Sequence, residues 1–320
     1  MKMLGIEELK EHIEVTKGKV ECPVRGCEKK VARQRGRFKK SGRFKCPEHN
    51  IYISPSTFEY EYDTDNLLWH GAEDLRLLNR LRAAKLASGM ARDNSEDAVT
   101  WNVFRYLDKE NLVVPVMERL IGVTLEEPEV IYWTYRGAED ADWSEFDRAR
   151  EEFGEHARGA GPDVIINSKN ALLFIEAKLI TGNETKPRKA KATEKLLEGG
   201  QHWFPRVFTS NYHTVAVKDK RYELMRFWLL GTWMAARRGI DFCLLNLVCE
   251  GREEDIETVF GRHISQSPAR VFKRITWEDI YRRVLECEEM SSGKDKMIRY
   301  FENKTAGYGR KGKLLRAFQV

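Results

Sequence analysis

The sequence predicts an α/β protein with a small metal-binding module near its N-terminus, and three observations support this prediction. Apolar runs of strand length occur at 163–166, 171–175 and 242–249. Helical patterns precede, separate and follow these runs, so helices and buried strands are mixed along the chain. Three of the six cysteines lie within the first 46 residues, a spacing that favours a metal site over a disulfide framework.

Composition sets only broad limits on function. The 320 residues are 42% hydrophobic, so a substantial core can form, and 33% charged. The net charge of +5 is a mild basic excess that does not by itself indicate nucleic acid. We see neither a signal-peptide pattern nor an apolar run of about 18 residues, so we expect a cytoplasmic protein that does not enter a membrane.

The chain is expected to divide into four segments: a zinc-ribbon-like basic module at 1–60, a connecting helical segment at 61–91, an α/β domain at 92–290 and a basic C-terminal tail at 291–320. Leucines at helical spacing predict the connecting helix near 72–89. Within the α/β domain the expected elements, in order, are a helix at 95–107, a strand at 129–135, a helix at 142–157, the strands at 163–166 and 171–175, helices at 190–206 and 220–238, the strand at 242–249 and a helix at 277–288.

Two neighbouring strands carry the candidate catalytic residues. The polar turn 167–170 separates two short apolar runs, which predicts a β-hairpin. If the turn is centred between Lys169 and Asn170, Asp163 lies opposite about position 176. Glu176 and Lys178 are two residues apart, so their side chains share one face of the strand. The hairpin therefore brings Asp163, Glu176 and Lys178 together.

This combination has a specific chemical use. Carboxylates from two strands are hard oxygen ligands that suit Mg²⁺, which keeps several waters and bridges to phosphates. The Ala177 carbonyl is a candidate third ligand. A bound metal would stabilise charge on a phosphate and acidify a water, and Lys178 would orient that water or neutralise the phosphate.

The motif Pro162-Asp163, twelve residues, Glu176-Ala177-Lys178 resembles the active-site motif of the PD-(D/E)xK nuclease superfamily. The resemblance covers about residues 92–290 and implies a restriction-endonuclease-like mixed sheet flanked by helices. More loosely, the whole chain resembles prokaryotic restriction-endonuclease-like proteins with an N-terminal zinc module. It implies hydrolysis of DNA with Mg²⁺ or Mn²⁺, in a restriction or defence role, and a supporting Glu on the preceding helix, which Glu96 matches.

Other interpretations stay open. A carboxylate and a lysine near strand ends are often surface charges or a salt bridge. Asp93 and Glu96 could instead form a capping box at the start of their helix. The chain could be a non-catalytic zinc-dependent DNA-binding protein on a nuclease-like scaffold, or a repair or junction-resolving nuclease. The oligomeric state is also open, with a homodimer among the candidates.

The first segment carries a predicted zinc site. Cys22 and Cys27 are separated by four residues, and Cys46 and His49 by two, so all four can reach one tetrahedral Zn²⁺. The alternative of buried free cysteines fits poorly, because few apolar residues lie between the two pairs.

Basic residues are concentrated beside this site. Nine Lys and Arg residues and one acid, Glu28, lie between Cys27 and Cys46, with two phenylalanines among them. This pattern favours contacts with phosphates and stacking on bases, and its alternative is a solvated hairpin. A second basic stretch follows Lys178. The residues that we expect to contact DNA are Arg33, Arg35, Arg37, Lys39, Lys40, Arg43, Lys189 and Lys191.

Overall fold

The computed structural model describes residues 8–84, 89–136, 141–155, 160–187, 193–287 and 291–320. No helix in these ranges combines the length and the apolar character that a membrane crossing requires. The chain forms two compact units. The terminal unit comprises Met1–Asp74, Ala87–Glu110 and Trp277–Val320, and the sheet unit comprises Leu75–Leu86 and Asn111–Thr276.

This division differs from the four expected segments. The N-terminal module, the helix that starts after residue 95 and the C-terminal residues all belong to the terminal unit. The expected boundaries at 60, 91 and 290 therefore do not separate the compact units. The physical reason is packing between segments far apart in sequence, which local patterns do not reveal.

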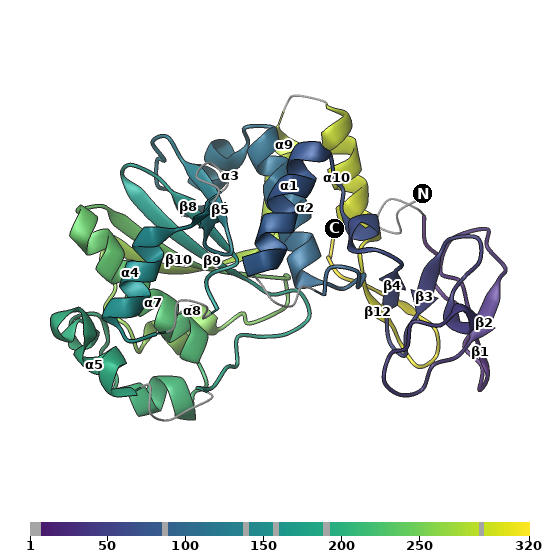
Figure 1. Ribbon diagram of the computed structural model, residues 1–320, viewed down its shortest axis with the longest axis horizontal. Helices are drawn as coiled ribbons and strands as arrows, with labels where there is room; N and C mark the ends of the chain where they lie inside the picture. The colour runs from purple at the N-terminus through teal and green to yellow at the C-terminus, as the bar shows by residue number, and fades with distance from the viewer. Residues whose placement is uncertain (1–7, 85–88, 137–140, 156–159, 188–192, 288–290) are drawn as a thin grey trace. The chain divides into compact units, whose positions relative to one another are not determined.

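The sheet unit is built on a seven-stranded mixed sheet with the strand order β11-β10-β9-β8-β5-β6-β7. Figure 1 labels β5, β8, β9 and β10 of this sheet. The strands are β5 (Glu129–Tyr132), β6 (Tyr135–Arg136), β7 (Ala141–Asp142), β8 (Val164–Asn167), β9 (Ala171–Ala177), β10 (Asp241–Val248) and β11 (Arg270–Thr276). β9, β10 and β11 are parallel, and the other neighbouring pairs are antiparallel. The mixed α/β class is as the sequence predicted.

Helices flank this sheet. They are α3 (Val113–Ile121), α4 (Ser144–Glu152), α5 (Thr193–His202), α6 (Phe204–Val207), the π-helical turn η4 (His213–Lys218), α7 (Tyr222–Arg238) and α8 (Ile256–Gly261), and α1 (Ala72–Ala84) contains the boundary between the units. Leu172 and Phe174 of β9 pack in one buried cluster with Phe146 of α4 and Leu229 of α7. Since side chains alternate along a strand, Glu176 points to this same helix-covered face.

Two expected elements are interrupted. The strand expected at 129–135 ends at Tyr132, and Trp133 and Thr134 form a two-residue turn with φ of 47° and 70° before β6. Both residues lie in the left-handed region, as such a hairpin turn requires. The helix expected at 190–206 is broken where Gly200 and Gln201 have φ of 59° and 57°.

The terminal unit consists of small sheets and helices. Its elements are β1 (Lys19–Glu21), β2 (Lys30–Ala32), η1 (Gly42–Phe44), β3 (Ile51–Ile53), β4 (Phe58–Tyr60), η2 (Asp63–Asn66), α2 (Glu96–Lys109), α9 (Trp277–Glu286), α10 (Ser292–Asn303), β12 (Thr305–Tyr308) and β13 (Leu314–Arg316). β1 pairs with β2, β3 with β4, and β12 with β13, all antiparallel.

The residues expected to form a basic tail are instead folded. Tyr308 and Leu314, from β12 and β13, belong to the same hydrophobic cluster as Val20 and Cys22. The Tyr308 hydroxyl donates to the Ser54 carbonyl oxygen at 2.5 Å. The many cations of 291–320 suggested a tail, but the apolar residues spaced between them complete the core of the N-terminal module.

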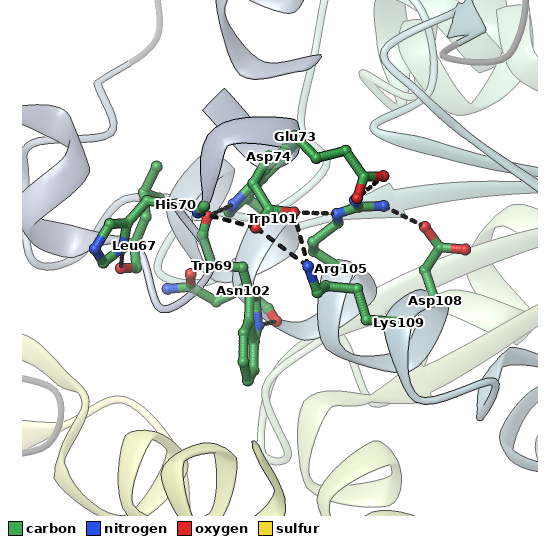
Figure 2. A network of polar contacts seen from close by, with 11 residues as sticks. Leu67, Trp69, His70, Glu73, Asp74, Trp101, Asn102, Arg105, Asp108 and Lys109 are labelled. Carbon is green, nitrogen blue, oxygen red and sulfur yellow. Dashed lines mark hydrogen bonds and ion pairs between the residues drawn. The ribbon is translucent and has the colours of Figure 1, made fainter. Parts of the chain in front are cut away.

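A buried ion-pair network joins the start of α1 to α2 (Figure 2). The guanidinium of Arg105 donates to Asp74 at 2.7 Å, to Asp108 at 2.7 Å and to Glu73 at 3.0 Å. Lys109 lies 3.3 Å from Asp74. Burial by itself would raise the pKa of Asp74, but hydrogen bonds and charges from Arg105 and Lys109 outweigh it and lower that pKa.

We expect Asp74→Asn to lower the free energy of unfolding of the terminal unit by about 3 kcal/mol, because it leaves the buried Arg105 guanidinium partly unpaired. Glu73→Gln is the matched control. The Glu73 side chain bonds the same Arg105 but is 80% exposed, so its loss should cost less than about 1 kcal/mol. Urea unfolding at pH 7 measures both, and equal losses would contradict the buried pair's importance.

Candidate functional site

The hairpin of β8 and β9 brings the motif residues together. Val164 pairs with Ile175, so the next position outward sets Asp163 beside Glu176, in the register that the sequence predicted. Asp163 is half-buried just before β8, Glu176 is buried within β9, and Lys178 is half-buried just after it. The Lys178 ammonium lies in direct contact with Glu176 Oε1.

Two donors fix the carboxylate of Asp163. Its Oδ1 accepts the Trp133 indole N–H at 3.0 Å, and its Oδ2 accepts the Ala177 backbone N–H at 2.9 Å. Trp133 occupies the left-handed turn between β5 and β6, a conformation that costs energy in a non-glycine residue and is found at functional sites. Gly161 is required here, since a Cβ at this position would lie 2.3 Å from Thr134 Cγ2.

Electrostatics set the site apart from an ordinary surface ion pair. Burial is the main cause that raises the pKa of Glu176 to about 8, with the nearby charges of Asp163 and Glu223 acting in the same direction and Lys178 opposing them. A strongly perturbed buried carboxyl group with specific charged neighbours is typical of a functional site.

Glu223 was not among the predicted site residues. It lies in the first turn of α7, where its N–H donates to Thr185 Oγ1 at 2.9 Å, so the loop after β9 is tied to this helix. An acidic residue at a helix N-terminus is ordinary, so the sequence gave no signal for it. The sequence also gave no signal for Trp133, because an aromatic residue is ordinary in a segment that is expected to form a strand.

The structure also locates the other predicted residues along the chain. Glu96 begins α2, directly after the N-cap Ser95, and Asp93 is instead buried in an ion pair with Lys304 at 3.2 Å. The expected DNA contacts Lys189 and Lys191 lie outside the described residues.

The terminal unit holds the four predicted zinc ligands together. Cys22, Cys27, Cys46 and His49 place one ligand atom each within 4.8 Å of one another. The Sγ atoms of Cys27 and Cys46 are 3.9 Å apart, and His49 Nδ1 lies 3.5 Å from Cys22 Sγ and 3.7 Å from Cys46 Sγ. A tetrahedral zinc with bonds of about 2.3 Å separates its ligands by about 3.8 Å, so the cluster can bind such a metal.

The cluster also favours a thiolate. A hydrogen bond from Cys22 is the main cause that lowers the pKa of Cys46 to about 4. The same contact, together with burial, raises the pKa of Cys22. One ligand is thus ionised near neutral pH, and a divalent metal would favour ionisation of the others. Within the described residues, these four are the only group of three or more His, Cys, Asp or Glu side chains whose ligand atoms lie this close together. The residues around Asp163 do not form such a group.

Exposed cations occupy the segment between the two pairs of predicted zinc ligands. Arg35, Arg37, Lys39, Lys40 and Arg43 are exposed, and Arg33 is half-buried. Several of them are fixed through backbone carbonyls: Arg33 donates to Thr16, Arg35 to Lys17 and Lys40 to Glu61. Such contacts hold the guanidinium and ammonium groups in place without neutralising them.

Comparison with protein-family models, with curated proteins and with solved structures gave no match to this chain.

Proposed function

We propose that this chain is a metal-dependent DNA endonuclease with Asp163, Glu176 and Lys178 at its active site. The observation that carries the proposal is the convergence of these three side chains at one end of the β8–β9 hairpin, with Glu176 buried beside a second carboxylate. A buried carboxylate next to like charges is unfavourable unless a cation compensates it. A restriction-endonuclease-like fold and a restriction or defence role follow from the motif resemblance.

The donor set fits Mg²⁺ or Mn²⁺. Hard cations of this kind use one or two protein carboxylates together with substrate phosphates, so a closed cage of protein ligands is not needed. Asp163 and Glu176 would hold the metal, and the Ala177 carbonyl is the proposed third ligand, since its N–H already bonds Asp163. When bound, the metal would stabilise charge on the phosphate and lower the pKa of a water.

The chain's own residues would then divide the remaining work. Trp133 and the Ala177 N–H keep the Asp163 carboxylate in one orientation, which reduces reorganisation during the reaction. Lys178 would orient the attacking water and neutralise the scissile phosphate. The attacking water would lose one proton to solvent as its oxygen bonds to phosphorus. The leaving sugar oxygen would take up one proton from solvent as its bond to phosphorus breaks.

The test is incubation of the protein with linear, supercoiled and branched DNA, with Mg²⁺, with Mn²⁺ and with EDTA. Cleavage that requires the metal is expected. Cleavage confined to branched DNA would favour a junction-resolving or repair nuclease. Binding without cleavage under all metal conditions would instead favour a non-catalytic DNA-binding protein.

Metal binding at this site should depend on pH. The raised pKa of Glu176 means that its carboxyl is largely protonated at pH 7 and must release a proton to bind a cation. We expect Mg²⁺ affinity to increase as pH rises from 6 to 8, with up to about one proton released per ion. Calorimetry in buffers of different ionisation enthalpy measures that release. The variant Glu176→Gln should bind Mg²⁺ weakly and independently of pH.

The same shift affects stability in the absence of metal. Because the folded-state pKa of Glu176 is above its unfolded value of 4.5, its favourable contribution is complete below pH 4.5 and is lost as pH rises toward 8. Saturating Mg²⁺ should therefore stabilise the sheet unit more at pH 8 than at pH 6.

The basic surface of the terminal unit is proposed to contact DNA phosphates. Arg37, Lys39 and Arg43 are exposed and make no ion pair with an acid in the described residues. Changing all three to Gln should reduce the slope of log affinity against log salt by about 2 to 3 and weaken binding roughly tenfold or more. Fluorescence anisotropy with a DNA duplex over a salt series measures both quantities.

The control for this variant changes three cations that already have acidic partners. Arg25 pairs with Glu8, Lys29 with Glu48 and Lys30 with Glu14. Their replacement by Gln should change the salt slope by less than the first triple variant does. Equal effects would mean that total charge, and not this surface, governs binding.

A further inference from the structure

A second polar cluster in the sheet unit joins Ser210, His263 and Asp219. His263 Nδ1 lies 2.8 Å from Ser210 Oγ, and His263 Nε2 lies 2.9 Å from Asp219 Oδ2. The imidazole is buried, with 3% of the residue exposed. Its loop is held beside the chain before Ser210, because the Thr209 N–H donates to the His263 carbonyl oxygen at 2.9 Å. One imidazole thus bridges a hydroxyl and a carboxylate.

The charges around His263 decide where its proton lies. Arg262 is 2.5 Å from the Asp219 carboxylate, and this pairing lowers the pKa of Asp219. A carboxylate can only accept, so the 2.9 Å contact assigns the proton to His263 Nε2, although Arg262 Nε lies 3.2 Å from the same nitrogen. Burial lowers the pKa of His263. The neutral imidazole therefore presents an unprotonated Nδ1 that accepts the Ser210 hydroxyl.

Ser210 lies on the wall of a cavity of about 660 Å³, within the size range of small-molecule sites. The apolar part of the wall includes Leu197 and the rings of Phe204 and Phe208, which stack with centroids 4.3 Å apart. The polar residues of the wall include His202, Asn211 and His213 besides Ser210. The cavity thus combines an apolar binding surface with a hydroxyl that an imidazole can deprotonate.

We propose that Ser210, His263 and Asp219 form a serine hydrolase site for carboxylic esters with an apolar acyl group. A hydroxyl, a neutral base and a carboxylate that orients this base are the parts that nucleophilic catalysis requires. In other serine hydrolases Nε2 usually accepts from the serine and Nδ1 donates to the carboxylate, whereas here Nδ1 faces the serine and Nε2 the carboxylate. The roles are unchanged, because one nitrogen still donates to the carboxylate and the other still accepts from the hydroxyl. This site shares no residue with the Asp163 site and needs no metal.

The proposed ester hydrolysis has two steps, acylation of Ser210 and release of the acyl group by water. Ser210 Oγ bonds to the ester carbonyl carbon while its proton moves to His263 Nδ1. The bond from that carbon to the alkoxy oxygen then breaks, and the departing alcohol takes the proton from Nδ1. A water next attacks the acyl group on Ser210, gives a proton to Nδ1 and releases the carboxylic acid as Ser210 regains its proton.

Asn211 is positioned to assist this chemistry. Its Oδ1 accepts the Thr214 N–H at 2.9 Å, and no group in the described residues accepts a hydrogen bond from its Nδ2. The side chain lies on the wall of the same cavity, one residue after the nucleophile. A side-chain amide beside the reacting carbonyl can stabilise the negative charge that develops on its oxygen.

The test uses the full chain and a hexyl fluorophosphonate. The Ser210 oxygen should bond to phosphorus as fluoride leaves, giving one adduct per chain that peptide mass spectrometry assigns to Ser210. Hydrolysis of 4-nitrophenyl butyrate should persist in EDTA and fall at least roughly 100-fold in Ser210→Ala. Asp219 is a positioning residue, so Asp219→Asn should reduce kcat about 100-fold with KM nearly unchanged.

Ser265→Ala is the matched control, a half-buried serine near His263 whose hydroxyl makes no contact with the imidazole in the described residues. It should retain labelling and turnover. Circular dichroism of each variant separates loss of folding from loss of the nucleophile. An absent adduct under excess fluorophosphonate, an adduct on another residue, or full ester turnover by a folded Ser210→Ala variant would overturn the proposal.

Discussion

Asp163→Asn should reduce metal-dependent DNA cleavage by roughly 10³-fold or more while DNA affinity stays within about twofold. The substitution keeps the size of the side chain and the acceptor for Trp133 or Ala177, but it removes a charged metal ligand. Loss of several kcal/mol of charge stabilisation in the transition state corresponds to three or more orders of magnitude. Binding should persist because most phosphate contacts are expected on the terminal unit.

Single-turnover cleavage in Mg²⁺ measures this effect, with DNA affinity measured in parallel by anisotropy in Ca²⁺. Glu184→Gln is the control. Glu184 lies in the loop that follows β9 and contains Lys178, but its side chain is 61% exposed and pairs with Lys220 at 3.0 Å. Its cleavage rate should match that of the unmodified protein. If Asp163→Asn cleaved at the normal rate, the metal assignment would be wrong whatever the fate of the Ser210 proposal.

Trp133 provides a graded variant of the same experiment. Trp133→Phe removes the indole N–H that bonds Asp163 Oδ1 but keeps an aromatic ring in the turn. The Ala177 N–H still holds the other oxygen, so we expect a loss of roughly 10-fold, much smaller than that of Asp163→Asn.

Cys46→Ser should lower the zinc content from about one ion per chain to roughly a tenth of that value and unfold the N-terminal module. Binding of a structural zinc contributes on the order of 10 kcal/mol to the stability of a small domain. Three of the four ligands belong to the hydrophobic cluster of the module, so loss of the ion also exposes its core. Elemental analysis of protein purified without added metal measures the zinc content.

The folded C-terminus adds a second measurement to this experiment. Because Tyr308 and Leu314 pack in that same cluster, loss of zinc should also release the β12–β13 hairpin and speed tryptic cleavage after Lys311 and Lys313. Cys287→Ser is the control, since Cys287 lies just after α9 and outside the cluster. A zinc-free protein that resists trypsin at this hairpin would show that the module folds without the metal.

The sequence determined those features that depend on residues close together in the chain. The polar turn at 167–170 between two apolar runs determined a hairpin and its register, so the sequence alone pairs Asp163 with Glu176. The spacing of Cys22, Cys27, Cys46 and His49 similarly determined a cluster, because a metal imposes its ligand geometry on nearby chain. The continuous apolar runs of β9 and β10 indicated full burial for the same kind of reason.

Tertiary structure decided what depends on segments far apart in sequence. The sequence of the C-terminal strands resembles a charged tail. In the folded protein Tyr308 and Leu314 find apolar partners in the N-terminal module. In the sequence Glu223 is an ordinary acidic residue in the first turn of a helix. The packing of α7 on the sheet brings its charge close enough to affect Glu176. Ser210, Asp219 and His263 are three isolated polar residues until the 209–219 segment meets the loop after α8. In each case the energy comes from burial and charge between distant residues, which no local pattern encodes.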